Sequence, residues 1–114
     1  MSVTLTEFDV SSSLDVRNVG DLMIVRFSGS RMLESSNVER TGRALNAVVA
    51  KGCPKTLVID FEEIEYLCTT ALSMLIPFRE FLMSNGCRLQ LCGLKPWIRE
   101  VFEVTKLDRL FDMT

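Results

Sequence analysis

Residues 56–73, TLVIDFEEIEYLCTTALS, constrain the fold of this chain more than any other segment. An apolar run at residues 57–59 ends in Asp60, and consecutive leucine and β-branched side chains are typical of a parallel strand covered on both faces. An acidic connection follows, and then two adjacent threonines, Thr69 and Thr70, stand at the beginning of a helical pattern. The segment therefore predicts a buried strand, a loop and a helix that begins beside hydroxyl groups.

Hydroxyl groups at a helix start have two interpretations. The first N–H groups of a helix have no intrahelical partner and carry partial positive charge, so they accept a side-chain cap or a phosphate. Thr69 and Thr70 are suitable caps, and the residues alone favour that interpretation. A phosphorylatable hydroxyl at the same position would instead be a regulatory switch.

The polar residues before the threonines have simpler expected roles. Asp60 is expected to end its strand and to hydrogen-bond the next loop. Glu62, Glu63 and Glu65 are expected to face solvent.

Composition excludes several classes of protein. The chain has 114 residues, of which 47% are hydrophobic and 25% charged, as in one folded domain. Its 13 basic and 15 acidic residues give a net charge of −2, which does not supply the basic surface of a nucleic-acid-binding module. No apolar run approaches the roughly 18 residues of a membrane span, and the N-terminus has no signal-peptide pattern. We therefore expect a cytoplasmic protein that does not insert into membranes.

Histidine is absent, which removes the commonest general base and metal ligand. Four cysteines occur without a C-x-x-C pair or a zinc-site spacing: Cys53, Cys68, Cys87 and Cys92. We expect free thiols, no metal site and no cofactor. Cys68 lies beside the threonines at a helix start, where a thiol gains reactivity, so a redox role is an alternative.

The rest of the chain predicts a single domain at residues 14–114, preceded by a polar, serine-rich and flexible arm at residues 1–13. Strands are predicted as a hairpin over residues 14–27 and singly at 56–61 and 88–92. This order, with a helix after each later strand, predicts an α/β fold. It is a mostly parallel sheet of about four strands with an N-terminal hairpin and helices packed on it.

Three helices are expected between and after these strands. The first follows a capping box formed by Ser36 and Glu39. The second runs from about Thr70 to Ser84 and is expected to kink at Pro77. The third begins at Pro96, with Trp97 near the rim, and in a last helical turn three side chains are expected to face inward: Leu107, Leu110 and Phe111.

Three segments together resemble one known family. Residues 57–60, LVID, and 64–72, IEYLCTTAL, are similar to a strand ending in aspartate, a loop and an Asp-Ser-Ser-Gly turn that opens a helix. Residues 86–92, GCRLQLC, and 96–111, PWIREVFEVTKLDRLF, are similar to a later strand and a closing segment. Over residues 14–113 the chain therefore resembles the STAS family, the anti-sigma factor antagonist domain.

The resemblance implies a regulatory protein-binding module, not an enzyme. In such proteins the unmodified form binds an anti-sigma factor that is also a serine/threonine kinase. Phosphorylation of the first hydroxyl of the turn releases the partner, and a phosphatase resets the switch. That hydroxyl falls on Thr69, and the implied partner-binding residues are Cys68, Thr69, Thr70 and Ser73. Cys68 stands where the family has aspartate, and Ala71 where it has glycine. A weak homo-oligomer is compatible with this function.

Two other functions stay open. A constitutive STAS subunit, for example of a transporter ATPase, would use Thr69 as a contact without phosphorylation. A small thiol redox protein would use Cys68, although the chain lacks histidine, C-x-x-C and a glycine-rich phosphate loop.

Overall fold

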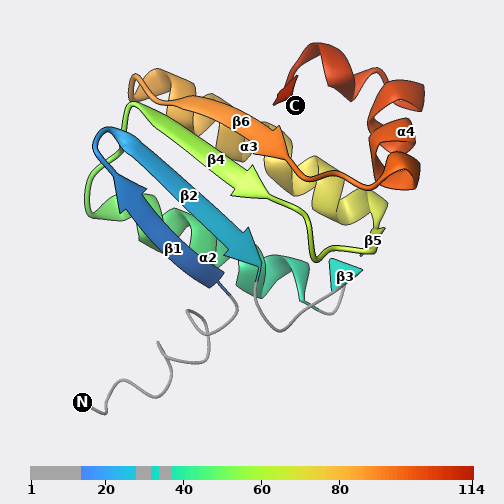
Figure 1. Ribbon diagram of the computed structural model, residues 1–114, viewed down its shortest axis with the longest axis horizontal. Helices are drawn as coiled ribbons and strands as arrows, with labels where there is room; N and C mark the ends of the chain where they lie inside the picture. Colours follow the sequence, from blue (N-terminus) through green and yellow to red (C-terminus); the bar gives the residue numbers. More distant parts are fainter. Residues whose placement is uncertain (1–13, 28–31, 34–36) are drawn as a thin grey trace.

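The computed structural model describes residues 14–27, 32–33 and 37–114, which fold around a five-stranded sheet (Figure 1). The strands lie in the order β1-β2-β4-β6-β7: β1 is Leu14–Val19, β2 Leu22–Phe27, β4 Thr56–Asp60, β6 Arg88–Cys92 and β7 Asp112–Met113. β1 and β2 form an antiparallel hairpin, and every later neighbour pairs in parallel. The predicted α/β architecture is confirmed. The arm predicted at residues 1–13 lies outside the described residues.

Gly20 makes the tight connection between β1 and β2. It is the first of the two turn residues between Val19 and Leu22, and its φ is +61°. A two-residue hairpin with positive φ at this position favours glycine, because a side chain would crowd the backbone. The turn fixes the register of the hairpin, from Val19 opposite Leu22 to Leu14 opposite Phe27.

Two helices, α2 (Val38–Ala50) and α3 (Thr69–Ser84), cover one face of the sheet, and none of the described helices covers the other face (Figure 1). Leu57 and Ile59 of β4 are fully buried, whereas Val58 points to the other face and is only half-buried. The expectation that this strand is covered on both faces is therefore wrong. Val58 suits the open face because its lateral neighbours, Ile24 and Gln90, cover part of it.

The first helix begins later than the capping box predicts. Asn37 occupies the N-cap position of α2, and no side-chain cap bond forms there. The predicted cap, Ser36, lies outside the described residues. Glu39 is exposed and forms a 4.0 Å ion pair with Arg43 one turn further along the helix.

The chain closes with α4 (Pro96–Val104), a 3₁₀ turn (Leu107–Arg109) and β7. Phe102 and Phe111 pack edge to face with ring centroids 5.7 Å apart. The expectation that three side chains of the last turn face inward is wrong for Leu110, which is 38% exposed, whereas Leu107 is half-buried and packs against the core. The chain leaves the 3₁₀ turn at Leu110 to enter β7, and of the three side chains only Phe111 is buried.

α3 continues as a helix through Pro77. Proline removes the hydrogen bond to the carbonyl four residues earlier, which belongs to Ser73. Ser73 and Pro77 are both exposed, so water can hydrate the carbonyl that loses its partner. The kink itself stays a prediction.

Replacing Pro77 with alanine is expected to hold or raise the free energy of unfolding, by up to about 2 kcal/mol. Alanine restores a helical N–H donor, while the more flexible unfolded chain offsets part of the gain. Urea unfolding measures the change, with Ser73→Ala as a matched control one turn earlier. A loss of stability of more than about 1 kcal/mol would mean that the neighbouring packing requires the proline.

Candidate partner-binding site at the start of α3

A short two-stranded sheet holds the start of α3 in place. β3 (Met32–Leu33) pairs in parallel with β5 (Tyr66–Leu67), and the N–H of Cys68 donates to the carbonyl of Leu33 at 2.8 Å. Figure 1 places β5 and the start of α3 at the end of the molecule where β4 and β6 finish and where α4 begins. Open α/β sheets commonly bind their ligands at this end.

The threonines do not cap the helix. Cys68 is the N-cap residue, in extended conformation and without a side-chain cap bond, and its carbonyl accepts from the N–H groups of Ala71 and Leu72 at 3.0 and 3.2 Å. Thr69 and Thr70 are the first two helical residues, and both are exposed. Within the described chain, no hydrogen bond uses either hydroxyl. The capping interpretation is therefore wrong.

The predicted partner-binding residues share one surface at the first turn of α3. Thr69, Thr70 and Ser73 are exposed and Cys68 is half-buried. Ala71 is completely buried, so the small residue at this position is needed for packing. The first turn therefore buries one side and presents the hydroxyl groups on the other.

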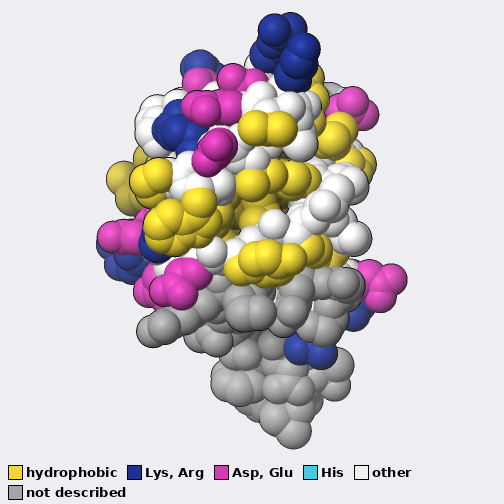
Figure 2. Space-filling model, turned by 90° about the vertical axis from the view of Figure 1, so that its right-hand side faces the viewer, with side chains coloured by type: hydrophobic (Ala, Val, Ile, Leu, Met, Phe, Trp, Pro, Cys, Tyr) yellow, Lys and Arg dark blue, Asp and Glu magenta, His cyan; other side chains and the backbone are white. Residues whose placement is uncertain are grey.

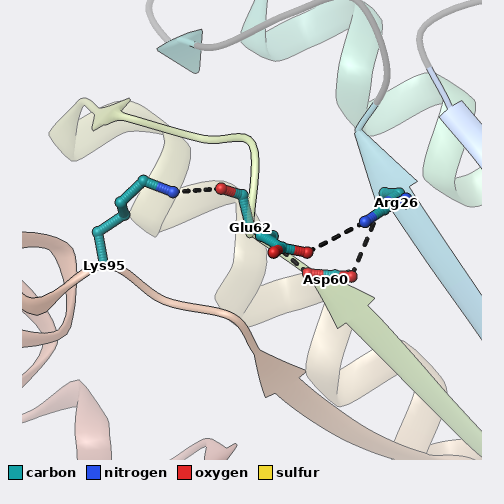
Figure 3. Close-up of polar contacts among 4 residues, drawn as sticks. All are labelled: Arg26, Asp60, Glu62 and Lys95. Atoms are coloured by element: carbon teal, nitrogen blue, oxygen red, sulfur yellow. Dashed lines mark hydrogen bonds and ion pairs between the residues drawn. The ribbon is translucent and has the colours of Figure 1, made fainter.

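A charged network holds the loop that leads to this surface (Figure 3). Asp60 Oδ1 accepts from the N–H of Glu62 at 2.9 Å, as predicted for a residue at the end of a strand. Arg26 Nη2 donates to Glu62 Oε1 at 3.0 Å, and Arg26 Nε lies 3.6 Å from Asp60 Oδ2. Lys95 Nζ donates to the carbonyl of Glu62. The hydrogen bond to Glu62 and then the charge of Asp60 raise the pKa of Arg26 above its ordinary value.

The sequence did not predict this network. Glu62 was expected to face solvent only, and Arg26 and Lys95 had no assigned role. The network could have been predicted only from the register of the sheet, in which Arg26 of β2 and Asp60 of β4 are direct neighbours.

Gly93 packs directly against the network. Its φ is +71°, and a Cβ at this position would lie 2.6 Å from Asp60 Oδ1 and 3.0 Å from the backbone nitrogen of Glu62. Only glycine fits both the conformation and the space.

The sequence of this chain matches the family model of the STAS domain over residues 13–114. The chain belongs to the STAS family. The match covers nearly the whole chain, and the order of strands and helices agrees with it.

Individual relatives of this STAS domain are anti-sigma factor antagonists by name. A Bordetella bronchiseptica protein named "Putative anti-sigma factor antagonist BtrV" is 29% identical over 98 residues, covering 86% of this chain and 82% of that protein. The crystal structure of an anti-sigma factor antagonist from Mycobacterium paratuberculosis superposes with a TM-score of 0.75 at 26% identity, covering 88% of this chain and 82% of that one.

The Bacillus protein SpoIIAA has the same fold at 18% identity. Its unphosphorylated form superposes with a TM-score of 0.71, covering 89% of this chain and 87% of SpoIIAA. Its phosphorylated form superposes with a TM-score of 0.64, covering 89% and 90%.

Two exposed aromatic residues lie beside the hydroxyl surface of this STAS domain. Tyr66 in β5 is 51% exposed and Trp97 in α4 is 54% exposed. The indole N–H of Trp97 donates to the carbonyl of Glu65 at 2.8 Å, so the ring is held against the loop. Figure 2 shows hydrophobic side chains gathered on this end of the molecule. The predicted position of Trp97 near the rim is confirmed.

All four cysteines of the STAS domain are free. Burial raises the pKa of the Cys87 thiol. Burial, and then the charges of Asp60 and Glu62, raise the pKa of Cys92. Both thiols are therefore protonated at neutral pH.

Neither a metal centre nor a membrane-spanning helix is found among the described residues. In this part of the chain, no group of three or more cysteine, aspartate or glutamate side chains is placed to hold a metal ion. No helix there has the length and apolar character required to cross a membrane.

Proposed function

We propose that this STAS domain binds an anti-sigma factor and that phosphorylation of Thr69 releases it. The partner is an anti-sigma factor with serine/threonine kinase activity, and a phosphatase restores the binding form. One observation carries the proposal: Thr69 is the first residue of α3, it is exposed, and among the described residues its hydroxyl makes no hydrogen bond. A hydroxyl that capped the helix would be needed for stability and would be less accessible to a kinase.

The helix start also explains how the folded domain would tolerate a phosphate. Among the described residues, the N–H groups of Thr69 and Thr70 donate to no backbone carbonyl. A phosphate adds about −1.5 to −2 charges at neutral pH, and free N–H groups with the helix dipole stabilise negative charge at this position. The fold of SpoIIAA carries a phosphorylated form, so a phosphate is compatible with this architecture.

The binding surface comprises Cys68, Thr69, Thr70 and Ser73, which lie together on the first turn. A partner that covers this turn excludes water from Thr69. A phosphate there would then be buried without a matching positive charge, which is unfavourable by several kcal/mol. Release follows from this cost and does not require the domain to unfold.

Regulation by binding requires no catalytic residue in this chain. Histidine is absent from the sequence, and among the described residues the hydroxyl of Thr69 forms no hydrogen bond to a base that could activate it. We infer that the domain is a regulatory module of the cytoplasm. Free thiols suit that reducing compartment.

Phosphopeptide mass spectrometry on the protein isolated from cells tests the switch. Trypsin cleaves after Lys55 and Arg79, so Thr69, Thr70 and Ser73 fall in one peptide and fragment ions must locate the phosphate. We expect the phosphate on Thr69, lost in Thr69→Ala and retained in Thr70→Ala. If the peptide is never phosphorylated while the protein binds its partner, the domain is a constitutive STAS subunit.

A further inference from the structure

Among the described residues, strand β1 leaves one edge of the sheet unpaired. In the described chain β1 pairs only with β2, and every residue of β1 after Leu14 is exposed (Figure 1). An edge strand presents backbone N–H and C=O groups that have no partner on one side, and it can pair with another strand. Val16 and Val19 add apolar exposure along this edge, at 37% and 55%.

The sequence of β1 is complementary to itself in one antiparallel register. In an antiparallel pair, opposite residues share a face, so a two-fold axis passes between two copies of the same residue. An axis at Val16 places Asp15 opposite the second copy's Arg17, and this pairing occurs twice. An axis at Asp15 or at Arg17 places two like charges directly opposite each other, which is destabilising. An axis at Asn18 places Val16 opposite Gly20 of the turn, so the paired segment ends there and Asp15 stays outside it.

We propose that β1 is a homodimer interface, in which two copies pair antiparallel about Val16 and their sheets become continuous. Asp15 and Arg17 point to the open face of the sheet, where their neighbours on β2 are Arg26 and Ile24. The two Asp15–Arg17 pairs therefore lie side by side on that face. Val16 meets its own copy on the opposite, helix-covered face.

Charged residues on an edge strand commonly prevent pairing, but this arrangement differs from a protective one. Two charges of the same sign at positions 15 and 17 would face each other with the axis at residue 15, 16 or 17. The Asp15-Val16-Arg17 sequence repels with the axis at Asp15 or at Arg17, and it attracts with the axis at Val16, where residues 14–18 of the two strands align. The charges thus favour the register about Val16 and disfavour the registers about Asp15 and Arg17.

The dimer leaves the surface at the start of α3 accessible. β1 is the outermost strand at one edge of the sheet, while β4 and β6, which lead to β5 and α4, lie inside it (Figure 1). One strand pair buries less surface than the roughly 1,200 Å² of a stable standard interface, so we expect a weak, concentration-dependent dimer. It would carry two copies of the Thr69 surface.

Sedimentation equilibrium from about 10 μM to about 1 mM tests the proposal on the whole chain. Wild type is expected to show a monomer–dimer equilibrium. Asp15→Arg and Arg17→Asp are each expected to weaken dimerisation about tenfold or more, because each creates like-charge pairs. An equimolar mixture of the two variants is expected to associate, since it restores two opposite-charge pairs between unlike chains. Lys51→Glu, on an exposed residue outside β1, matches the charge change of Arg17→Asp and is expected to leave dimerisation unchanged.

Melting curves of both variants verify that each chain is folded, and a variant that melts early is replaced by Asp15→Asn or Arg17→Gln. The proposal is overturned if wild type is monomeric throughout, or if the single variants dimerise as strongly as wild type. It is also overturned if the folded variants fail to associate when mixed. Phosphorylation of Thr69 is independent of all these outcomes.

Discussion

Thr69→Glu is expected to weaken binding of the anti-sigma factor by about a hundredfold or more without unfolding the domain. Thr69 is exposed at the first position of α3, where the partner would bury it. A buried carboxylate without a positive partner is costly at the interface. In the free domain the same carboxylate faces free N–H groups and a favourable helix dipole, so the melting temperature is expected to hold or rise slightly.

Thr69→Ala is expected to bind as tightly as wild type and to escape regulation. Lys51→Gln is the matched control, because it changes the net charge by the same amount as Thr69→Glu at an exposed residue that follows α2. Calorimetric titration with the anti-sigma factor of the same organism, alongside melting curves, measures the effect. A Thr69→Glu variant that binds as tightly as wild type would contradict the switch and favour the constitutive subunit.

The sequence predicted the elements whose signals are local. The hairpin over residues 14–27 follows from alternating side chains and a Gly-Asp turn, and β6 was predicted with its observed bounds. The helix start beside Thr69 was predicted to within one residue, because it depends on the residues around it. Those signals were sufficient to place the candidate residues at the start of a helix, where the structure has them.

Elements that depend on distant partners were not predicted. β3, β5 and β7 have two residues each, which is too short for any periodicity, and they exist because a parallel neighbour pairs with them. The contact of Arg26 with Asp60 likewise requires the register of β2 on β4, which no local pattern specifies. The cap role of Cys68 was missed because its backbone, not its side chain, closes the first turn.

Gly93→Ala is expected to lower the free energy of unfolding by about 2–4 kcal/mol, which combines left-handed strain with a steric clash. The new Cβ would lie 2.6 Å from Asp60 Oδ1, and relief of the contact would move the carboxylate away from the N–H of Glu62. Because that hydrogen bond holds the loop leading to β5, the substitution is expected to loosen the start of α3 as well.

Gly86→Ala is the matched control for this prediction. Gly86 has nearly the same φ, +76° against +71°, but nothing lies within 4 Å of the point that its Cβ would occupy, so only strain of about 1–2 kcal/mol is expected. Urea unfolding measures the loss of unfolding free energy in both variants, and the difference between the two losses gives the contribution of the steric clash. The double variant Asp60→Ala/Gly93→Ala completes a double-mutant cycle. In the Asp60→Ala background the carboxylate is absent, so the loss of unfolding free energy caused by Gly93→Ala should fall toward that caused by Gly86→Ala. If Gly93→Ala costs no more than Gly86→Ala in the wild-type background, the Asp60 contact does not hold the loop.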